Sequence, residues 1–154
     1  MDIVDRDTRS RMMRGIRSRN TRPEILIRRL LHQKGFRFKL HDSKLPGKPD
    51  IVLPKYRAVV FVHGCFWHGH DCHLFKMPST RREFWKNKIE KNRLNDVRAF
   101  RELRSMAWRV VTIWECATKG PTRLEHGIIV ECLASWLLGE ENVLEIPQDG
   151  EERG

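Results

Sequence analysis

The chain has 154 residues, 40% of them apolar, which suits one domain with a substantial core, and it contains no apolar run long enough to span a membrane. Its 30 lysine and arginine residues against 20 aspartate and glutamate residues give a net charge of +10 and a pI near 10. A basic excess of this size favours a polyanionic partner. Because the N-terminus lacks the apolar region of a secretory signal, we expect a cytoplasmic protein whose four cysteines are metal ligands or core residues, not disulfides.

The first twenty residues are predicted to form a basic arm. Residues 6–22 are rich in arginine, and Met12, Met13 and Ile16 recur at near-helical spacing. We expect a short helix or arm over residues 1–20 that folds against DNA. A solvated, partly disordered tail fits the same composition.

A helix start follows the arm. Thr21 is a suitable N-cap, Pro23 suits the first turn, and Glu24 completes a capping box. The apolar periodicity then continues to a stop at Gly35. Residues 36–40 alternate apolar and basic side chains, which predicts a strand with one buried face.

Two strands lead into the most unusual segment of the chain. Residues 50–53 are predicted to form a short strand after a turn-rich loop, and the β-branched run at residues 58–62 is typical of a central strand covered on both faces. Their tight connection predicts an antiparallel pair. The loop that follows contains, within eleven residues, His63, Cys65, Phe66, Trp67, His68, His70, Cys72 and His73.

A long charged helix is predicted after this loop. A second capping box, made of Thr80 and Glu83, would begin it, and its pattern continues to about Ser105. We expect its apolar side to consist of Phe84, Ile89, Leu94, Val97, Phe100 and Leu103.

The last third of the chain predicts one more strand and one more helix. Residues 108–114 are predicted to form a buried strand, and residues 122–138 are predicted to form a helix. The mostly acidic segment at residues 140–154 is expected to be a weakly ordered tail. The order of elements over residues 21–139 predicts an α/β, or mixed α+β, domain of three layers, with a central mixed sheet flanked by helices.

The cysteine and histidine spacing predicts a structural zinc site. Zinc prefers four soft or borderline ligands in a tetrahedron, and one compact run supplies three of them: Cys65, His70 and Cys72. Cys116 is the best fourth ligand, because it follows a predicted strand that would lie parallel to residues 58–62. His73 and His63 are competing fourth ligands, and Cys132 lies within an apolar helical face and reads as a core residue.

A second group of residues has the chemistry of a nuclease. Asp50 opens one strand of the predicted hairpin and would lie near the end of the other, beside His63 and His68. One carboxylate and a backbone carbonyl are enough to hold a mostly hydrated Mg²⁺. An imidazole can activate water or protonate a leaving group. Glu24 joins this group from the first helix, or serves only as the carboxylate of its capping box.

At these residues the chain resembles the very short patch repair (Vsr) endonucleases, a mismatch-nicking branch of the restriction-endonuclease-like superfamily. The resemblance extends from about Thr8 to Gly139 and rests on PGKPD at 46–50, VFVHGCFWHGHDC at 60–72, Phe84-Trp85 and WEC at 114–116. Two features depart from the pattern. Val62 stands where a family member carries Thr, and the lysine and second acidic residue of the wider superfamily are absent from residues 58–62.

The resemblance implies a restriction-endonuclease-like fold, a structural zinc, and a Mg²⁺-dependent nick on the 5′ side of the thymine in a T:G mismatch. Because such mismatches arise when 5-methylcytosine deaminates, it also implies association with a cytosine-5 DNA methyltransferase. The expected protein is a monomer in the bacterial cytoplasm, nucleoid-associated when bound to DNA, with mismatch-repair proteins as further partners. The rival interpretations are a zinc-stabilised nucleic-acid-binding protein without catalysis and a restriction-type endonuclease that cuts undamaged DNA.

Carried over residue by residue, the resemblance makes Asp50 the metal-binding carboxylate, with the backbone carbonyl of Val62 beside it. His68 becomes the catalytic base, and His63 and Glu24 become supporting groups. The structural zinc ligands that it implies are Cys65, His70, Cys72 and Cys116. The residues that it implies for intercalation or DNA contact are Phe66, Trp67 and Trp85, with Met13, Arg14 and Arg17 in the arm.

Overall fold

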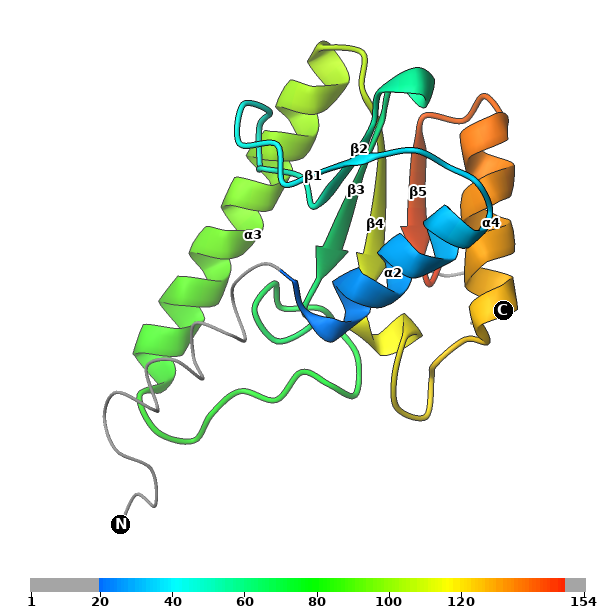
Figure 1. Ribbon diagram of the computed structural model, residues 1–154. Coiled ribbons are helices and arrows are strands. Elements are labelled where there is room, and N and C mark those ends of the chain that lie inside the picture. The colour runs from blue at the N-terminus through cyan, green and yellow to red at the C-terminus, as the bar shows by residue number, and fades with distance from the viewer. Residues whose placement is uncertain (1–19, 149–154) are drawn as a thin grey trace.

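A five-stranded mixed sheet forms the centre of the computed structural model, which describes residues 20–148 (Figure 1). The strands lie in the order in which they occur in the chain: β1 (Lys39–Leu40), β2 (Ile51–Leu53), β3 (Ala58–His63), β4 (Arg109–Trp114) and β5 (Val143–Ile146). The pairs β1–β2 and β2–β3 are antiparallel, whereas β3–β4 and β4–β5 are parallel. The predicted mixed sheet and the predicted antiparallel hairpin are therefore confirmed.

Helices cover both faces of this sheet. Successive side chains of a strand point to opposite faces, so each strand contributes to two cores. The alternate residues Val60, Val111 and Ile113 pack with α2 (Arg22–Gln33) and α4 (His126–Leu138). The others, Val59, Phe61 and Val110, pack with Leu103 of α3 (Arg82–Ser105). The three-layer arrangement follows from this alternation, and β3 is the doubly covered central strand that its sequence predicts.

The first helix begins and ends where the sequence predicts. The hydroxyl of Thr21 accepts a hydrogen bond from the backbone N–H of Glu24 at 3.4 Å, and the carboxylate of Glu24 accepts one from the backbone N–H of Asn20 at 3.1 Å. The helix stops at Gln33, two residues before Gly35, whose φ of +92° suits a residue without a Cβ. Within residues 20–148 no helix is both long and apolar enough to cross a membrane.

The α3 helix differs from its prediction at its start and along its apolar side. Its N-cap is Arg81, with a left-handed φ of 55°, and no side-chain hydrogen bond caps it among the described residues, so the expected Thr80–Glu83 capping box is wrong. Of the six apolar side chains, only Ile89 and Leu103 are buried, while the exposed ones are Phe84, Leu94, Val97 and Phe100. α3 runs alongside the sheet and continues past its lower end (Figure 1), and Val97 and Phe100 line the open cleft.

Two short elements also differ from expectation. The strand predicted at residues 36–40 is reduced to the two exposed residues of β1, which pair with only two residues of β2 at the edge of the sheet. The last helix begins at His126 and not at residue 122. The hydroxyl of Thr122 donates to the carbonyl of Cys116 at 2.9 Å, and the N–H of Leu124 donates to the carbonyl of Ala117 at 2.9 Å, so these residues form a loop tied to the 3-10 turn η2 (Glu115–Ala117).

The segment expected to be a weakly ordered tail contains a strand. Residues 143–146 form β5, which pairs with β4 from Val110 opposite Val143 to Ile113 opposite Ile146. Ile146 is 2% exposed and belongs to the core under α2 and α4. The acidic composition of residues 140–154 conceals this short apolar run. Residues 149–154, like most of the expected N-terminal arm, lie outside the described part of the chain.

Candidate active site and metal centres

Three chain segments meet at one edge of the sheet. The parallel register places His63 at the end of β3 opposite Trp114 at the end of β4. Because β2 is antiparallel to β3, its starting end lies at the same edge, with Asp50 immediately before it. An open cleft of about 1490 Å³ at this edge is lined by, among others, Asp50, His63, His68, Phe66 and Trp85.

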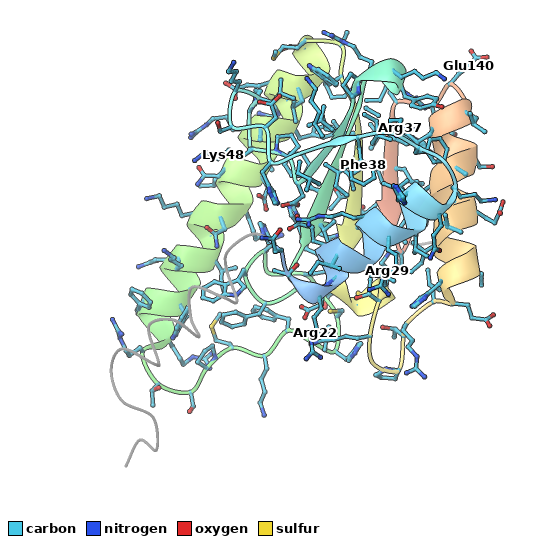
Figure 2. The ribbon with its side chains drawn as sticks, in the orientation of Figure 1. Arg22, Arg29, Arg37, Phe38, Lys48 and Glu140 are labelled. Carbon is cyan, nitrogen blue, oxygen red and sulfur yellow. The ribbon has the colours of Figure 1, made fainter. Side chains whose placement is uncertain are left out.

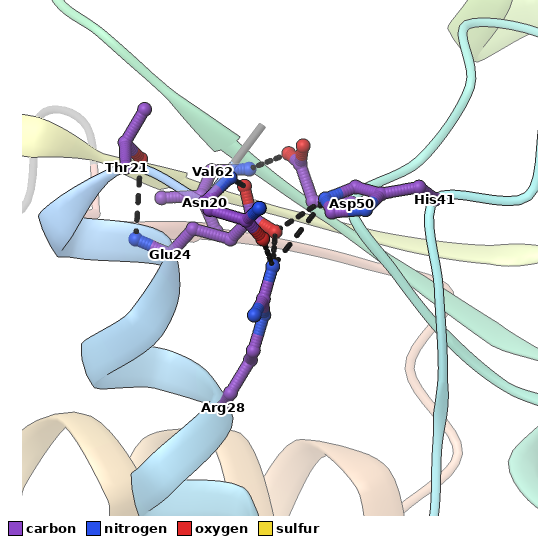
Figure 3. A network of polar contacts seen from close by, with 7 residues as sticks. All are labelled: Asn20, Thr21, Glu24, Arg28, His41, Asp50 and Val62. Carbon is purple, nitrogen blue, oxygen red and sulfur yellow. Dashed lines mark hydrogen bonds and ion pairs between the residues drawn. The ribbon is translucent and has the colours of Figure 1, made fainter. Parts of the chain in front are cut away.

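Asp50 is held by the strand that it faces. The backbone N–H of Val62 donates to Oδ2 of Asp50 at 2.7 Å (Figure 3). Burial raises the pKa of Asp50 to about 6, against the lowering effect of this hydrogen bond, while the negative charge of Glu24 raises it further. A half-buried carboxylate suits a hard divalent cation, and such a cation would offset the cost of burying the charge.

Glu24 makes the contacts of a helix cap and also lies beside the proposed catalytic group. It caps α2, yet its side chain is 2% exposed and its Oε2 contacts Arg28 and the Nε2 of His41 (Figure 3). His41 was not singled out by the sequence. Its backbone has a left-handed φ of 48°, and its N–H donates to the carbonyl of Asp50 at 3.0 Å. The ligand atoms of Glu24, His41 and Asp50 all lie within 4.8 Å of one another.

The two histidines of the loop stack on each other. The ring centroids of His63 and His68 are 3.8 Å apart, and the ring planes differ by 4°. Burial, with a smaller contribution from His68, holds the pKa of His63 well below its usual value, so His63 is neutral. Its Nδ1 has no hydrogen-bond partner among residues 20–148.

A carboxylate on α3 orients His68. Oδ2 of Asp96 lies 2.6 Å from Nδ1 of His68. A carboxylate at this position accepts the Nδ1 proton, which leaves Nε2 able to take a proton from another group. Nothing in the sequence pointed to Asp96, since one aspartate in a charged helix is an ordinary solvated residue. Only the crossing of α3 over the loop brings it to His68.

The four predicted zinc ligands converge. The sulfur and nitrogen ligand atoms of Cys65, His70, Cys72 and Cys116 lie within 4.8 Å of one another. Nδ1 of His70 is 3.5 Å from Sγ of Cys65 and 3.6 Å from Sγ of Cys116. Burial, and then the neighbouring Cys72, raise the pKa of Cys116 to about 11, and burial likewise raises the pKa of Cys65. A cation among these thiols would reverse both shifts, because it stabilises the thiolates.

The competing ligands lie elsewhere. Nδ1 of His73 is 3.5 Å from the hydroxyl of Thr122, and His63 stacks on His68. The half-buried Cys132 packs against the main core, as expected. Geometry therefore favours Cys116 as the fourth member of the group.

The three aromatic residues expected to contact DNA form one cluster in the cleft. The ring centroids of Phe66 and Trp67 are 5.2 Å apart, and each lies 5.5 Å from the ring of Trp85. Phe66 and Trp85 are half-buried, whereas Trp67 is only 9% exposed. The carbonyl of Trp67 accepts a hydrogen bond from the side chain of Asn92 on α3 at 2.8 Å. The remaining expected DNA contacts lie outside the described residues: Met13, Arg14 and Arg17.

Comparison with known proteins agrees with this site. The family model described as "DNA mismatch endonuclease Vsr" matches residues 1–74. The DNA mismatch endonuclease Vsr of Escherichia coli K12 is 44% identical over 149 residues, which cover 97% of this chain and 96% of that protein. The type II nicking enzyme V.XorIIP of Xanthomonas oryzae is 49% identical over 75% of this chain and 85% of its own. The type II nicking enzyme V.NmeAIP of Neisseria meningitidis is 44% identical over 77% of this chain and 84% of its own. The chain is thus a DNA endonuclease that belongs to the DNA mismatch endonuclease Vsr family.

Proposed function

We propose that this endonuclease, with a restriction-endonuclease-like architecture, makes a Mg²⁺-dependent nick on the 5′ side of the thymine in T:G mismatches left by deamination of 5-methylcytosine. The observation that carries the proposal is the single cleft in which Asp50, the His68–Asp96 pair and the aromatic cluster lie together. The description of the matching family and the name of the E. coli relative support the mismatch as substrate.

In this mechanism the chain first positions the scissile phosphodiester. Asp50 and the carbonyl of Val62 would hold Mg²⁺, which, when bound, supplies charge neutralisation at the phosphate. The Val62 side chain adds no ligand, since it is a hydrocarbon that packs against the main core, while its backbone N–H donates to Asp50. Glu24 holds His41 against the segment that carries Asp50 and so keeps the carboxylate in place.

His68 is the proposed base. Nε2 of His68 takes the proton of the attacking water while the oxygen forms its bond to phosphorus, and the departing oxygen takes a proton from solvent. Asp96 keeps the proton of His68 on Nδ1 and stabilises the imidazolium that forms. The neutral His63 ring stacked on His68 limits the orientations that the base can adopt.

Zinc and the aromatic cluster have supporting functions in this proposal. A closed group of three cysteines and one histidine leaves no open position on zinc, so the ion would be structural. It would fix the loop from which Phe66, Trp67 and His68 project. With Trp85, the two aromatic residues would insert at the mismatch, where unstacking costs less than in matched DNA.

The remaining parts of the proposal concern the surroundings of the enzyme. Residues 1–20 would clamp the DNA, with Met13, Arg14 and Arg17 in contact with it. We propose that the enzyme acts as a monomer in the cytoplasm, associated with the nucleoid when bound to DNA. A cytosine-5 DNA methyltransferase and mismatch-repair proteins would be its functional partners.

Cleavage of a strand-labelled duplex with one T:G mismatch tests the proposal, with a matched duplex as the control and with and without Mg²⁺. We expect one nick, in the thymine strand only, that requires the metal ion and the mismatch. If no strand-specific nick forms, the proposed mismatch specificity is wrong. If the matched duplex is cut equally, the enzyme is of the restriction type.

A further inference from the structure

Lys48 lies two residues before Asp50, in the turn that leads into β2. We propose that Lys48 binds a backbone phosphate of the DNA next to the carboxylate of Asp50 and thereby positions the strand to be cut. The proposal rests on the identity of the chain as a DNA endonuclease, but not on its preference for a mismatch. It adds a substrate-binding residue that lies outside the histidines, the zinc ligands and the aromatic cluster.

The backbone of Lys48 adopts an unfavourable conformation. Its φ is 49°, in the left-handed region that glycine and asparagine tolerate better than lysine. The next residue is Pro49, and a residue before proline is normally extended. Backbone strain of this kind is concentrated at functional sites. A glycine would fit this turn without strain, so the turn itself does not require a lysine.

The turn itself is fixed in place. A Cβ at Gly47 would lie 2.7 Å from the Cβ of Ala99 on α3 and 3.1 Å from the ring of Phe61 on β3, so the backbone packs directly against both elements. The N–H of Lys48 donates to the carbonyl of Leu45 at 3.0 Å, and Pro49 is buried. Lys48 therefore projects from a rigid support, although its own side chain is exposed.

The charges that line the cleft explain why a cation is needed there. Its acidic lining residues are Glu24, Asp50, Asp96, Glu115 and Glu145, whereas its basic ones are Arg22, Lys48 and Lys119. Glu24 and Glu115 are paired with Arg28 and Lys119. A DNA strand that reaches Asp50 would still meet the carboxylates of Asp50, Asp96 and Glu145, whose charges repel phosphate.

Only part of this basic lining is available to DNA. Lys119 is already paired with Glu115, at 3.0 Å. Lys48 makes no ion pair with any residue of the segment 20–148, and neither does Arg22. Figure 2 shows Arg22 at the start of α2 and Lys48 in the turn beside α3. Of the two basic lining side chains that remain free to contact phosphate within residues 20–148, Lys48 is the one close to Asp50 in the sequence. A flexible ammonium group binds a phosphate oxygen well.

Three variants test the proposal: Lys48→Gln, which removes the charge, Lys48→Gly, which removes the charge and the backbone strain, and Lys48→Arg, which keeps the charge. The control is Lys44→Gln, in the same loop but outside the cleft lining. Binding to the T:G duplex is measured by fluorescence anisotropy without divalent metal, over a range of salt concentrations, and the melting temperature of each variant is recorded.

We expect Lys48→Gln and Lys48→Gly to weaken DNA binding roughly 3- to 10-fold at about 0.1 M salt and to lower the salt slope by about one, as for the loss of one phosphate contact. Lys48→Arg should retain binding, Lys44→Gln should change it little, and Lys48→Gly should melt no lower than the unmodified protein. Binding and salt slope unchanged in Lys48→Gln, or equally reduced in Lys44→Gln, would overturn the inference. So would a lower melting temperature of Lys48→Gly with unchanged binding. Failure of the unmodified protein to nick the T:G duplex would reject the proposed function instead.

Discussion

The substitution Asp96→Asn isolates the contribution of the His68–Asp96 pair, because it keeps the shape of the side chain and removes its charge. A hydrogen bond to a charged group contributes about 1.5–3 kcal/mol when it is shielded from water. The side chains of Asp96 and His68 are 32% and 23% exposed, so a value of about 2 kcal/mol is appropriate. If this bond stabilises the imidazolium formed during cleavage, the loss corresponds to about a 30-fold lower rate of the chemical step.

Single-turnover cleavage of a T:G duplex, with enzyme in excess, measures that rate apart from product release. The dissociation constant for the same duplex is measured without divalent metal and should not rise, since Asp96 does not contact DNA in this mechanism and loss of its charge only reduces the repulsion of phosphate. Glu90→Gln is the matched control, because Glu90 is an exposed carboxylate on the same helix. A cleavage rate within twofold of the unmodified enzyme, or a loss confined to DNA affinity, would refute the assignment of His68 as an Asp96-oriented base.

Three further predictions concern the metal centres. Asp50→Asn should abolish cleavage. Because the pKa of Asp50 is about 6 in the folded protein and 3.8 as its ordinary value, the folded state takes up a proton between these pH values, and stability falls as the pH rises through that window. Thermal melts of the metal-free protein should therefore show Asp50→Asn to be the more stable variant at pH 7.5, with the difference shrinking at pH 4; an equal difference at both would contradict the raised pKa. Cys116→Ala should lose bound zinc, measured by mass spectrometry, and melt at a lower temperature; full zinc occupancy would point instead to His73 or His63 as the fourth ligand. Val62→Thr should leave the cleavage rate within twofold of the unmodified enzyme, and a large gain would show that the hydroxyl contributes.

The sequence predicted those parts of the site that depend on strand ends. The tight hairpin placed Asp50 beside Val62, and the 2.7 Å bond between them confirms that register. Likewise, the parallel pairing of β3 and β4 brought Cys116 to the other three candidate zinc ligands. Both inferences needed only the direction of strands and the spacing of residues along them.

The parts that could not be predicted depend on packing between distant elements. Asp96 reaches His68 because of the angle at which α3 crosses the loop, which its charged pattern does not encode. His41 reaches Glu24 because its backbone is left-handed, and no residue pattern near His41 predicts that conformation. The apolar side of α3 was overestimated, since periodicity shows which residues share a face but not how far the neighbouring sheet extends.

Because of β5, the folded domain extends beyond Gly139, where the sequence predicted that it ends. A chain shortened to Gly139 would leave β4 at the margin of the sheet, with a row of unsatisfied backbone groups able to pair with another molecule. It would also lose Glu145, whose carboxylate accepts the indole N–H of Trp114 at 2.6 Å, and Trp114 stacks on the ring of His70. Residues that look like an acidic appendage in the sequence thus pair with β4, which would otherwise be the open edge, and brace the ring against which a zinc-ligand candidate rests.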